Sequence, residues 1–268
     1  MTTRRAIEHR VSQGIARVTS LARLDLLRTT RSGAWAFEHA YWMYKRSVEA
    51  PGVATLSKYV EPGGVIIDVG ANLGFFSRLF VGYPQTPQVV AIEPESRNLA
   101  SLHRGVARWG DGRVVVVEAA AADIDGILNL HVDKHNHADH QLADDGVQIK
   151  AVCLDTLMTD MGLGPVSLVK IDVQGGEERV LGGATALINR DHPTIFVEID
   201  PVRLAKQGSE PRTILESLVS KRYEFFFLDR RECRSVTIDG VLDAVKHEGY
   251  VDVLAVWAES RLRPVVHS

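Results

Sequence analysis

The chain has 268 residues, of which 45% are hydrophobic and 24% charged, and its formal net charge is −3. These values are typical of one soluble globular domain with extensions, and the absence of a long basic tract argues against a nucleic-acid partner. No apolar run approaches the roughly 18 residues of a membrane span, and the first residues, MTTRRAIEHR, lack the apolar core of a secretory signal peptide. Two distant cysteines, Cys153 and Cys233, form neither a zinc spacing nor a disulfide framework, which favours a cytoplasmic location.

The first part of the chain has an amphipathic helical pattern and many aromatic residues. We predict an N-terminal helical cap over residues 1–50 and one main domain over residues 51–268. We interpret the aromatic residues as packing residues, with stacking on a sugar ring as the alternative. They are Trp35, Phe37, Tyr41, Trp42 and Tyr44.

A glycine turn follows the first predicted strand. Val65–Phe76 reads VIIDVGANLGFF, in which apolar residues lead to Asp68 and two glycines, Gly70 and Gly74, bracket a turn before a helical pattern. This order is typical of a doubly wound α/β fold, whose ligands bind beyond the carboxyl ends of the strands. The spacing matches neither G-x-G-x-x-G nor G-x-x-x-x-G-K-[ST]. It suits a cofactor with a ribose and an ammonium group, such as S-adenosylmethionine, although glycines also serve plain strand-to-helix turns.

The next predicted strand, Gln88–Ile92, ends in a carboxylate, Glu93. A carboxylate at the tip of the second parallel strand can accept hydrogen bonds from both ribose hydroxyls. The alternative is a solvated carboxylate at a strand end. The separation of Asp68 and Glu93 fits one strand–helix–strand unit.

Further strands and helices alternate along the chain, which predicts a mostly parallel sheet covered on both faces. The predicted core strands are Val65–Val69, Gln88–Ile92, Arg113–Glu118, Ser167–Asp172, Thr194–Ile199, Glu224–Leu228 and Val251–Trp257. The predicted helices are Phe75–Val81, Arg97–Trp109, Glu177–Asn189 and Pro211–Ser220.

Two segments depart from this alternation. Ile127–Val132 and Val147–Val152 are predicted as short strands that flank a polar loop, KHNHADHQLADDG. Near the C-terminus, Glu224–Leu228 and Val251–Trp257 are separated by a segment that we interpret as turn-rich, so we expect an antiparallel hairpin at the sheet edge. The fold class is therefore α/β, with a doubly wound, mostly parallel seven-stranded sheet of the Rossmann-like methyltransferase type and an antiparallel edge strand.

Several motifs together resemble one known family. Leu168–Ala184 reads LVKIDVQGGEERVLGGA and resembles the hallmark segment of FkbM-type S-adenosylmethionine-dependent O-methyltransferases, KIDVEG followed by E-x-x-V-L-x-G-A. The resemblance covers about residues 65–200. Gln174 stands where the family usually has Glu, so we do not expect an essential acid there. Residues 1–50 and 200–268 match poorly, and we expect acceptor choice to lie in them. Further matches are IIDVGANLGFFS at Ile66–Ser77, AIEP at Ala91–Pro94, VCLDTL at Val152–Leu157 and PTIFVEID at Pro193–Asp200.

The resemblance implies a set of contacts with S-adenosylmethionine. Glu93 would hold the ribose. Ala119 and Ala120 would lie against the adenine, and Asp172 and Val173 near the methionine end and the methyl group. The residues that would hold the amino-acid part are Asp68, Gly70, Asn72 and Gly74.

Methyl transfer to a hydroxyl also needs a group that accepts the hydroxyl proton, and histidine is suited to this near neutral pH. Four of the 10 histidines lie in His131–His140. Within NHADHQL, the residues Asn136, Asp139 and His140 resemble a polar motif of the same family. We predict His140 as the general base, oriented by Asp139 or Asp172, with His137 as the next candidate. The alternative is a solvated surface loop.

Carboxylates at strand ends permit a second mechanism. Asp172, Glu198 and Asp200 could hold magnesium, which would acidify the acceptor hydroxyl. We favour the alternative, in which Glu198 and Asp200 cap strand ends and bind the acceptor or backbone groups. Zinc patterns such as H-E-x-x-H are absent from the sequence.

The sequence therefore predicts an O-methyltransferase that uses S-adenosylmethionine and acts on a hydroxyl of a small molecule. A sugar or a glycolipid or polysaccharide precursor is the expected acceptor, with a polyketide as another. The alternatives are an N-methyltransferase of the same fold and a non-catalytic S-adenosylmethionine-binding module. The intact residues Gly70, Gly74, Glu93 and Asp172 argue against the non-catalytic alternative. The oligomeric state stays open, with a homodimer as one alternative.

Overall fold

The computed structural model describes residues 50–131, 141–143, 146–229 and 233–264, together with five isolated positions before residue 50. Most of the predicted helical cap lies outside these residues. Trp42 is described, and its ring lies 5.0 Å from that of Phe75, with the Arg78 guanidinium 4.4 Å above it. This contact agrees with the packing interpretation for Trp42. The other predicted aromatic positions lie outside the described residues, namely Trp35, Phe37, Tyr41 and Tyr44.

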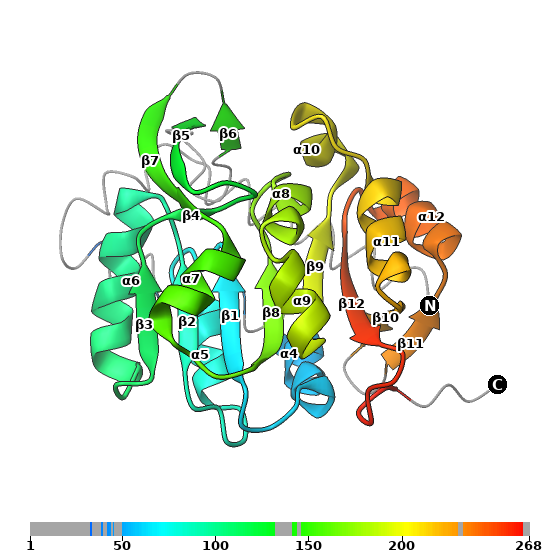
Figure 1. Ribbon diagram of the computed structural model, residues 1–268, viewed down its shortest axis with the longest axis horizontal. Coiled ribbons are helices and arrows are strands. Elements are labelled where there is room, and N and C mark those ends of the chain that lie inside the picture. Colours follow the sequence, from blue (N-terminus) through cyan, green and yellow to red (C-terminus); the bar gives the residue numbers. More distant parts are fainter. Residues whose placement is uncertain are drawn as a thin grey trace.

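A central sheet of eight strands runs through the molecule, in the order β11-β10-β12-β9-β8-β1-β2-β3 (Figure 1). Neighbouring strands are parallel from β9 to β3, whereas β12 is antiparallel to both β9 and β10. The doubly wound, mostly parallel sheet expected from the sequence is thus confirmed. The strands are β1 Val65–Val69, β2 Val89–Ile92, β3 Val114–Val117, β8 Val166–Ile171, β9 Thr194–Ile199, β10 Tyr223–Leu228, β11 Cys233–Val236 and β12 Val251–Trp257.

Helices cover both faces of the sheet. β1 and β8 are buried along their whole length, which explains their continuous apolar and β-branched sequence. One apolar cluster lies between the sheet and α7, α8, α9, α11 and α12, and another lies under α4 and α5 on the opposite face. No helix in the described part of the chain has both the length and the apolar character needed to cross a membrane. The helices are α4 Ala50–Leu56, η1 Ser57–Tyr59, α5 Phe75–Val81, α6 Ser96–Trp109, α7 Leu154–Met161, α8 Glu177–Gly182, α9 Thr185–Asp191, α10 Pro201–Lys206, α11 Pro211–Ser220 and α12 Ile238–Glu248.

The C-terminal segment differs from the predicted hairpin. β10 and β12 pair antiparallel as expected, but the segment between them holds β11 and α12, so the turn-rich interpretation is wrong. Thr237 begins α12 by accepting a hydrogen bond from the backbone N–H of Gly240, and Val241 and Val245 are buried one helical turn apart. β11 pairs with β10 and becomes the edge strand, which gives eight strands in place of seven.

A second, smaller sheet lies beyond the carboxyl ends of the parallel strands, at the top of Figure 1. Its order is β4-β7-β5-β6, and β5 pairs antiparallel with both β6 and β7. The two strands predicted here are confirmed, with the first ending at His131. Its strands are β4 Ala120–Ala121, β5 Gly126–His131, β6 Gln141–Ala143 and β7 Val147–Val152.

The predicted helix Glu177–Asn189 is two helices, α8 and α9, because the helix is interrupted where the backbone makes a close contact. An added Cβ at Gly183 would lie 2.0 Å from the carbonyl oxygen of Ala122. The Asp155 side chain of α7 then accepts hydrogen bonds from the first N–H groups of α9, at 2.9 Å from Ala186 N and 2.7 Å from Leu187 N. A residue about thirty positions earlier therefore caps this helix, which a local sequence pattern does not reveal.

We expect Asp155→Ala to lower the free energy of unfolding by about 1–2 kcal/mol, because two backbone N–H groups of α9 lose their acceptor. Urea unfolding followed by circular dichroism measures the change. Asp160→Ala is the matched control, since Asp160 is exposed on the same helix. Equal stability of the two variants would contradict the capping role of Asp155.

Candidate active site

Three carboxylates meet where β8, β1 and β2 end. Asp68 lies near the end of β1, Glu93 directly follows β2, and Asp172 directly follows β8. Because these three strands are neighbours and parallel, their carboxyl ends form one edge of the sheet. This edge is where doubly wound folds bind their ligands. The structure therefore brings together residues that the sequence separates by about one hundred positions.

The turn at Gly70 is pressed against the end of β8. Gly70 has φ +73°, and its N–H donates to the carbonyl oxygen of Ile92 at 3.0 Å. An added Cβ would lie only 1.9 Å from the carbonyl oxygen of Asp172. Both the backbone angle and the space therefore require glycine at this position.

Gly74 is restricted by a different neighbour. It precedes α5 with φ +83°, and an added Cβ would lie 2.7 Å from Leu102 Cδ1 and 3.0 Å from Trp109 Cζ2. Leu102 and Trp109 belong to α6. Gly74 thus lets α6 pack closely against the turn, and this packing helps to set the shape of the turn.

Glu93 is buried and fixed by backbone groups. Its side chain is 5% exposed, and it accepts hydrogen bonds from Asn72 N at 2.8 Å and from Glu95 N at 2.9 Å, with Asn98 Nδ2 at 3.4 Å. The alternative of a solvated carboxylate is therefore wrong. Burial raises the pKa of Glu93 to about 7, against the lowering effect of these hydrogen bonds. Carboxylate oxygens carry two lone pairs each, so Oε2 retains acceptor capacity for a ligand hydroxyl.

Asp68 and Lys170 form a buried ion pair between β1 and β8. The two residues are paired in register, Asp68 is 0% and Lys170 2% exposed, and Lys170 Nζ lies 3.3 Å from Asp68 Oδ1. Ser77 of α5 donates to the other oxygen, Oδ2, at 2.6 Å. The Asp68 side chain thus supports the turn from inside the core. Lys170 has no role in the sequence-based predictions, although a lysine within an otherwise apolar strand is a detectable signal.

Asp172 is the most open of the three carboxylates, with 26% of its side chain exposed. Gln174 Nε2 donates to Asp172 Oδ1 at 3.0 Å, and Lys170 Nζ lies 3.6 Å from Oδ2. Burial works against ionisation of Asp172, but Lys170, Lys45 and Arg203 outweigh it and hold its pKa below the usual range. Asp172 is therefore ionised near neutral pH.

Glu177 fixes the turn between β8 and α8. It is buried, and its Oε1 accepts hydrogen bonds from the N–H groups of Val173 at 3.2 Å and Gly175 at 3.1 Å. Glu177 lies in the family motif, but the motif alone does not identify this contact. The backbone beside Asp172 is thereby held in one conformation.

The two carboxylates at the end of β9, Glu198 and Asp200, both contact residues of α10. Asp200 caps this helix by accepting from Val202 N at 2.9 Å and Arg203 N at 3.1 Å, as the capping interpretation predicted. Glu198 pairs with Arg203 at 3.1 Å, while burial and nearby Asp172 raise the pKa of Glu198 well above its usual range. Among the described residues, no group of three His, Cys, Asp or Glu side chains is placed to hold a metal ion.

The remaining predicted site residues fall into two groups. Ala119 and Ala120 are buried just beyond β3, at the same edge of the sheet. The predicted base lies in the segment between β5 and β6, and that segment is outside the described residues. The positions concerned are Asn136, His137, Asp139 and His140.

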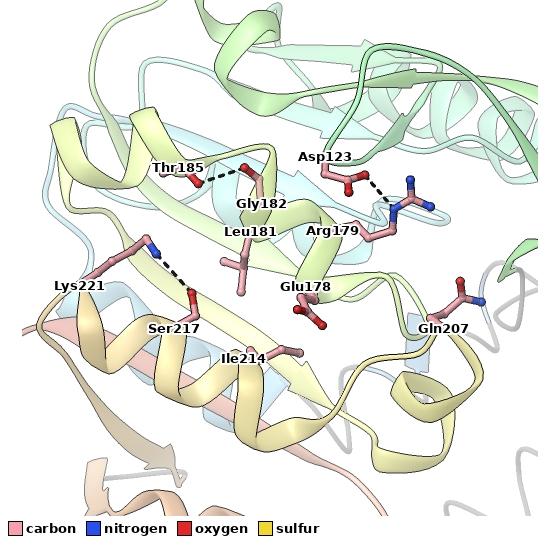
Figure 2. Close-up of a pocket in the computed structure, with 10 residues that line it drawn as sticks. All are labelled: Asp123, Glu178, Arg179, Leu181, Gly182, Thr185, Gln207, Ile214, Ser217 and Lys221. Carbon is pink, nitrogen blue, oxygen red and sulfur yellow. Dashed lines mark hydrogen bonds and ion pairs between the residues drawn. The ribbon is translucent and has the colours of Figure 1, made fainter.

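A separate cavity of about 520 Å³ lies between α8 and α11 (Figure 2). Leu181 and Ile214 form its apolar part, and an ion pair of 2.8 Å between Arg179 and Asp123 lies at one side. Its lining shares no residue with the strand-end site. The cavity is therefore distinct from the edge formed by β8, β1 and β2.

We expect Gly70→Ala to reduce the binding of S-adenosylhomocysteine more than about tenfold, because the added Cβ must displace the backbone of Asp172. Gly112→Ala is the matched control. Gly112 also has positive φ, +82°, but nothing lies within 4 Å of an added Cβ. The control should lose about 1 kcal/mol of stability and keep its affinity in calorimetry. Equal affinity of both variants would show that the Gly70 contact does not shape the binding site.

Comparison with known proteins identifies the family. The model of the methyltransferase FkbM domain matches residues 68–227. A curated relative, the 2-O-methyltransferase NoeI of Sinorhizobium fredii, is 24% identical in an alignment of 180 residues, and the match covers 60% of this chain and 73% of the relative.

Solved methyltransferase structures are also similar. One is an FkbM methyltransferase of Methylobacillus flagellatus, with 18% identity over 73% of this chain and a TM-score of 0.43; the match spans only 44% of that chain. Another is the precorrin-6y C5,15-methyltransferase of Geobacter metallireducens, with 14% identity, a TM-score of 0.43, and coverage of 77% of this chain and 86% of that one. Because the family match spans residues 68–227, more than half of the 268 residues, the chain belongs to the FkbM-type methyltransferases and uses S-adenosylmethionine as its cofactor.

Proposed function

We propose that this methyltransferase transfers the methyl group to a hydroxyl of a small molecule, with a sugar or a glycolipid or polysaccharide precursor as the acceptor. The observation that carries the proposal is the pair of unlike carboxylates at one sheet edge, the buried Glu93 and the partly exposed, ionised Asp172. The preference for oxygen rests on the relative described as a 2-O-methyltransferase. The name of that relative specifies 2-O-methylation and does not name the acceptor. A sugar acceptor is compatible with it.

The residues at the strand ends fit the parts of the cofactor. We assign Glu93 to the ribose hydroxyls, because its carboxylate is oriented by backbone N–H groups and Oε2 retains capacity to accept a hydrogen bond from the ribose. Asp172 and Val173 lie beside the Gly70 turn and are assigned to the methionine end. Asp68, Asn72 and Gly74 support that turn, and the small residues Ala119 and Ala120 leave room for the adenine.

When bound, S-adenosylmethionine supplies a methyl group that is already activated by the sulfonium. The chain must then align the acceptor oxygen and remove its proton. We assign proton removal to His140, oriented by Asp139 or Asp172, with His137 as the next candidate. Glu198 already pairs with Arg203 and Asp200 already caps α10, so a magnesium mechanism that uses these carboxylates is not favoured.

Two alternatives predict different outcomes. An N-methyltransferase would act on an amine acceptor, and its rate would depend less on a protein base. A non-catalytic module would bind S-adenosylhomocysteine without turnover on any hydroxylated acceptor. A methyl-donor turnover assay against a panel of sugars, glycolipids and matched amines separates these alternatives from the proposal.

The raised pKa of Glu93 gives a pH dependence of binding. Ribose hydroxyls donate to the ionised carboxylate, and Glu93 with a pKa of about 7 is mostly protonated at pH 6 and mostly ionised at pH 8. We therefore expect the affinity for S-adenosylhomocysteine to rise about tenfold from pH 6 to pH 8. Calorimetry in buffers of different ionisation enthalpy should also show proton release at pH 6.

Glu93→Gln should remove this pH dependence and weaken binding by about 2–4 kcal/mol, since the charge-assisted bonds are lost. Glu118→Gln is the control, because Glu118 follows the neighbouring strand β3 but its side chain is 64% exposed. An unchanged pH profile in folded Glu93→Gln would rule out the ribose assignment.

His140→Ala is expected to lower turnover by roughly 10²–10⁴ on the true acceptor while S-adenosylhomocysteine affinity stays nearly constant. The wild-type rate at saturating cofactor should rise with pH through the histidine pKa, because only neutral imidazole accepts a proton. EDTA should have little effect. His103→Ala, in the exposed pair with Glu118, is the control. Near-normal turnover of His140→Ala, or silencing by EDTA with recovery on added magnesium, would overturn the assignment.

A further inference from the structure

Lys170 is a buried cation with no role in the function proposed above. It lies in β8 with its side chain 2% exposed, and the Phe76 ring centroid is 5.0 Å from its Nζ. A buried ammonium group is costly unless hydrogen bonds and opposite charges compensate it. The groups around Nζ therefore indicate what the lysine is there to hold.

Those groups come from both sides of the junction between β1 and β8. Lys170 Nζ donates to the carbonyl oxygens of Val69 at 3.2 Å and Gly70 at 3.0 Å. It also lies 3.3 Å from Asp68 Oδ1 and 3.6 Å from Asp172 Oδ2. One ammonium group thus contacts the end of β1, the glycine turn and the carboxylate that follows β8.

We propose that Lys170 is a positioning residue of the cofactor site, whose ammonium group ties the Gly70 turn to β8 and holds the Asp172 carboxylate in its ionised, aligned state toward the methionine end of S-adenosylmethionine. This inference rests on the proposed assignment of the turn and Asp172 to that end of the cofactor. The lysine itself is enclosed and acts through these neighbours.

The charges that face Asp172 explain why a cation is needed there. Lys45 of the N-terminal segment, Arg203 of α10 and Lys170 favour its ionised form, whereas burial opposes it. The charge of Asp172 in turn contributes to the raised pKa of two neighbouring carboxyl groups, Glu198 on β9 and Glu177 on α8. Removing Lys170 takes away a positive charge beside Asp172 while the neighbouring carboxylates remain, and this favours protonation of Asp172.

The pKa of Lys170 agrees with this geometry. Burial lowers it, but Asp172 and Asp68 outweigh burial and hold it above the usual range, against the repulsion of Lys45. The lysine thus stays charged wherever the two carboxylates are ionised.

The first test is calorimetry of S-adenosylhomocysteine binding to Lys170→Met. We expect affinity to fall at least tenfold at pH 8, and to fall further between pH 8 and pH 6 than it does in the wild type, because Asp172 then takes up a proton. Lys246→Met is the control, since Lys246 is exposed on α12. A loss of the same size at both pH values would indicate packing alone and overturn the proposal, as would an unchanged affinity.

Lys170→Met leaves Asp68 as a buried, uncompensated charge, so a second variant removes both partners. Lys170→Met combined with Asp68→Asn keeps an acceptor for Ser77 and avoids the isolated charge. We expect this double variant to fold and to retain the steeper pH dependence of binding. Wild-type pH dependence in the folded double variant would overturn the proposal.

A measurement without ligand separates this inference from the cofactor assignment. The Asp172 carboxyl group, assigned in carbon-13 spectra by comparison with Asp172→Asn, is titrated in the wild type and in the double variant. We expect a higher Asp172 pKa in the double variant, and an equal pKa would overturn the role of Lys170. If the wild type failed to bind S-adenosylhomocysteine, the residue assignments under the proposed function would fall, while this titration would still decide what Lys170 does.

Discussion

The turn at Gly70 lies so close to the end of β8 that the space for a single Cβ atom is missing between them. This contact joins two parts of the chain that lie about one hundred residues apart, and Lys170 reinforces it with hydrogen bonds to the last carbonyl groups of β1 and its turn. The position of Asp172 relative to the glycine turn follows from it. The contacts of Gly74 with α6 and of Glu177 with the β8–α8 turn then fix the surrounding backbone.

The acidic residues of the site are made different by their surroundings. Asp68 and Asp172 share a lysine, and the pKa of Asp172 is held low. Glu93 instead accepts hydrogen bonds from two backbone N–H groups, and burial raises its pKa to about 7. Glu198 is paired with Arg203, yet burial and the nearby carboxylates raise its pKa. Carboxylates of this edge thus differ in how readily they ionise, because burial and neighbouring charges differ around each of them.

The helices around this edge are held by contacts from distant segments. Asp155 of α7 caps α9, Asp200 caps α10 from the end of β9, and Trp42 of the N-terminal segment packs on α5. The cavity between α8 and α11 has its own polar lining and shares no residue with the site.

The sequence alone determined the fold class, because continuous apolar strands, a glycine turn and helical periodicity are local patterns. It also located Asp68, Gly70, Glu93 and Asp172, since residues at the ends of parallel strands must share one edge of the sheet. The sequence did not reveal α12 and β11, whose pairing and burial depend on β10 and the sheet.

Only the tertiary structure decided what each acidic residue contacts. The pairing of Lys170 with two carboxylates, the capping of α9 by Asp155 and the clash that requires glycine at position 70 all join distant positions. Burial and charge depend on neighbours in space, so the ionisation of Glu93, Asp172 and Glu198 could not be read from residue type or spacing.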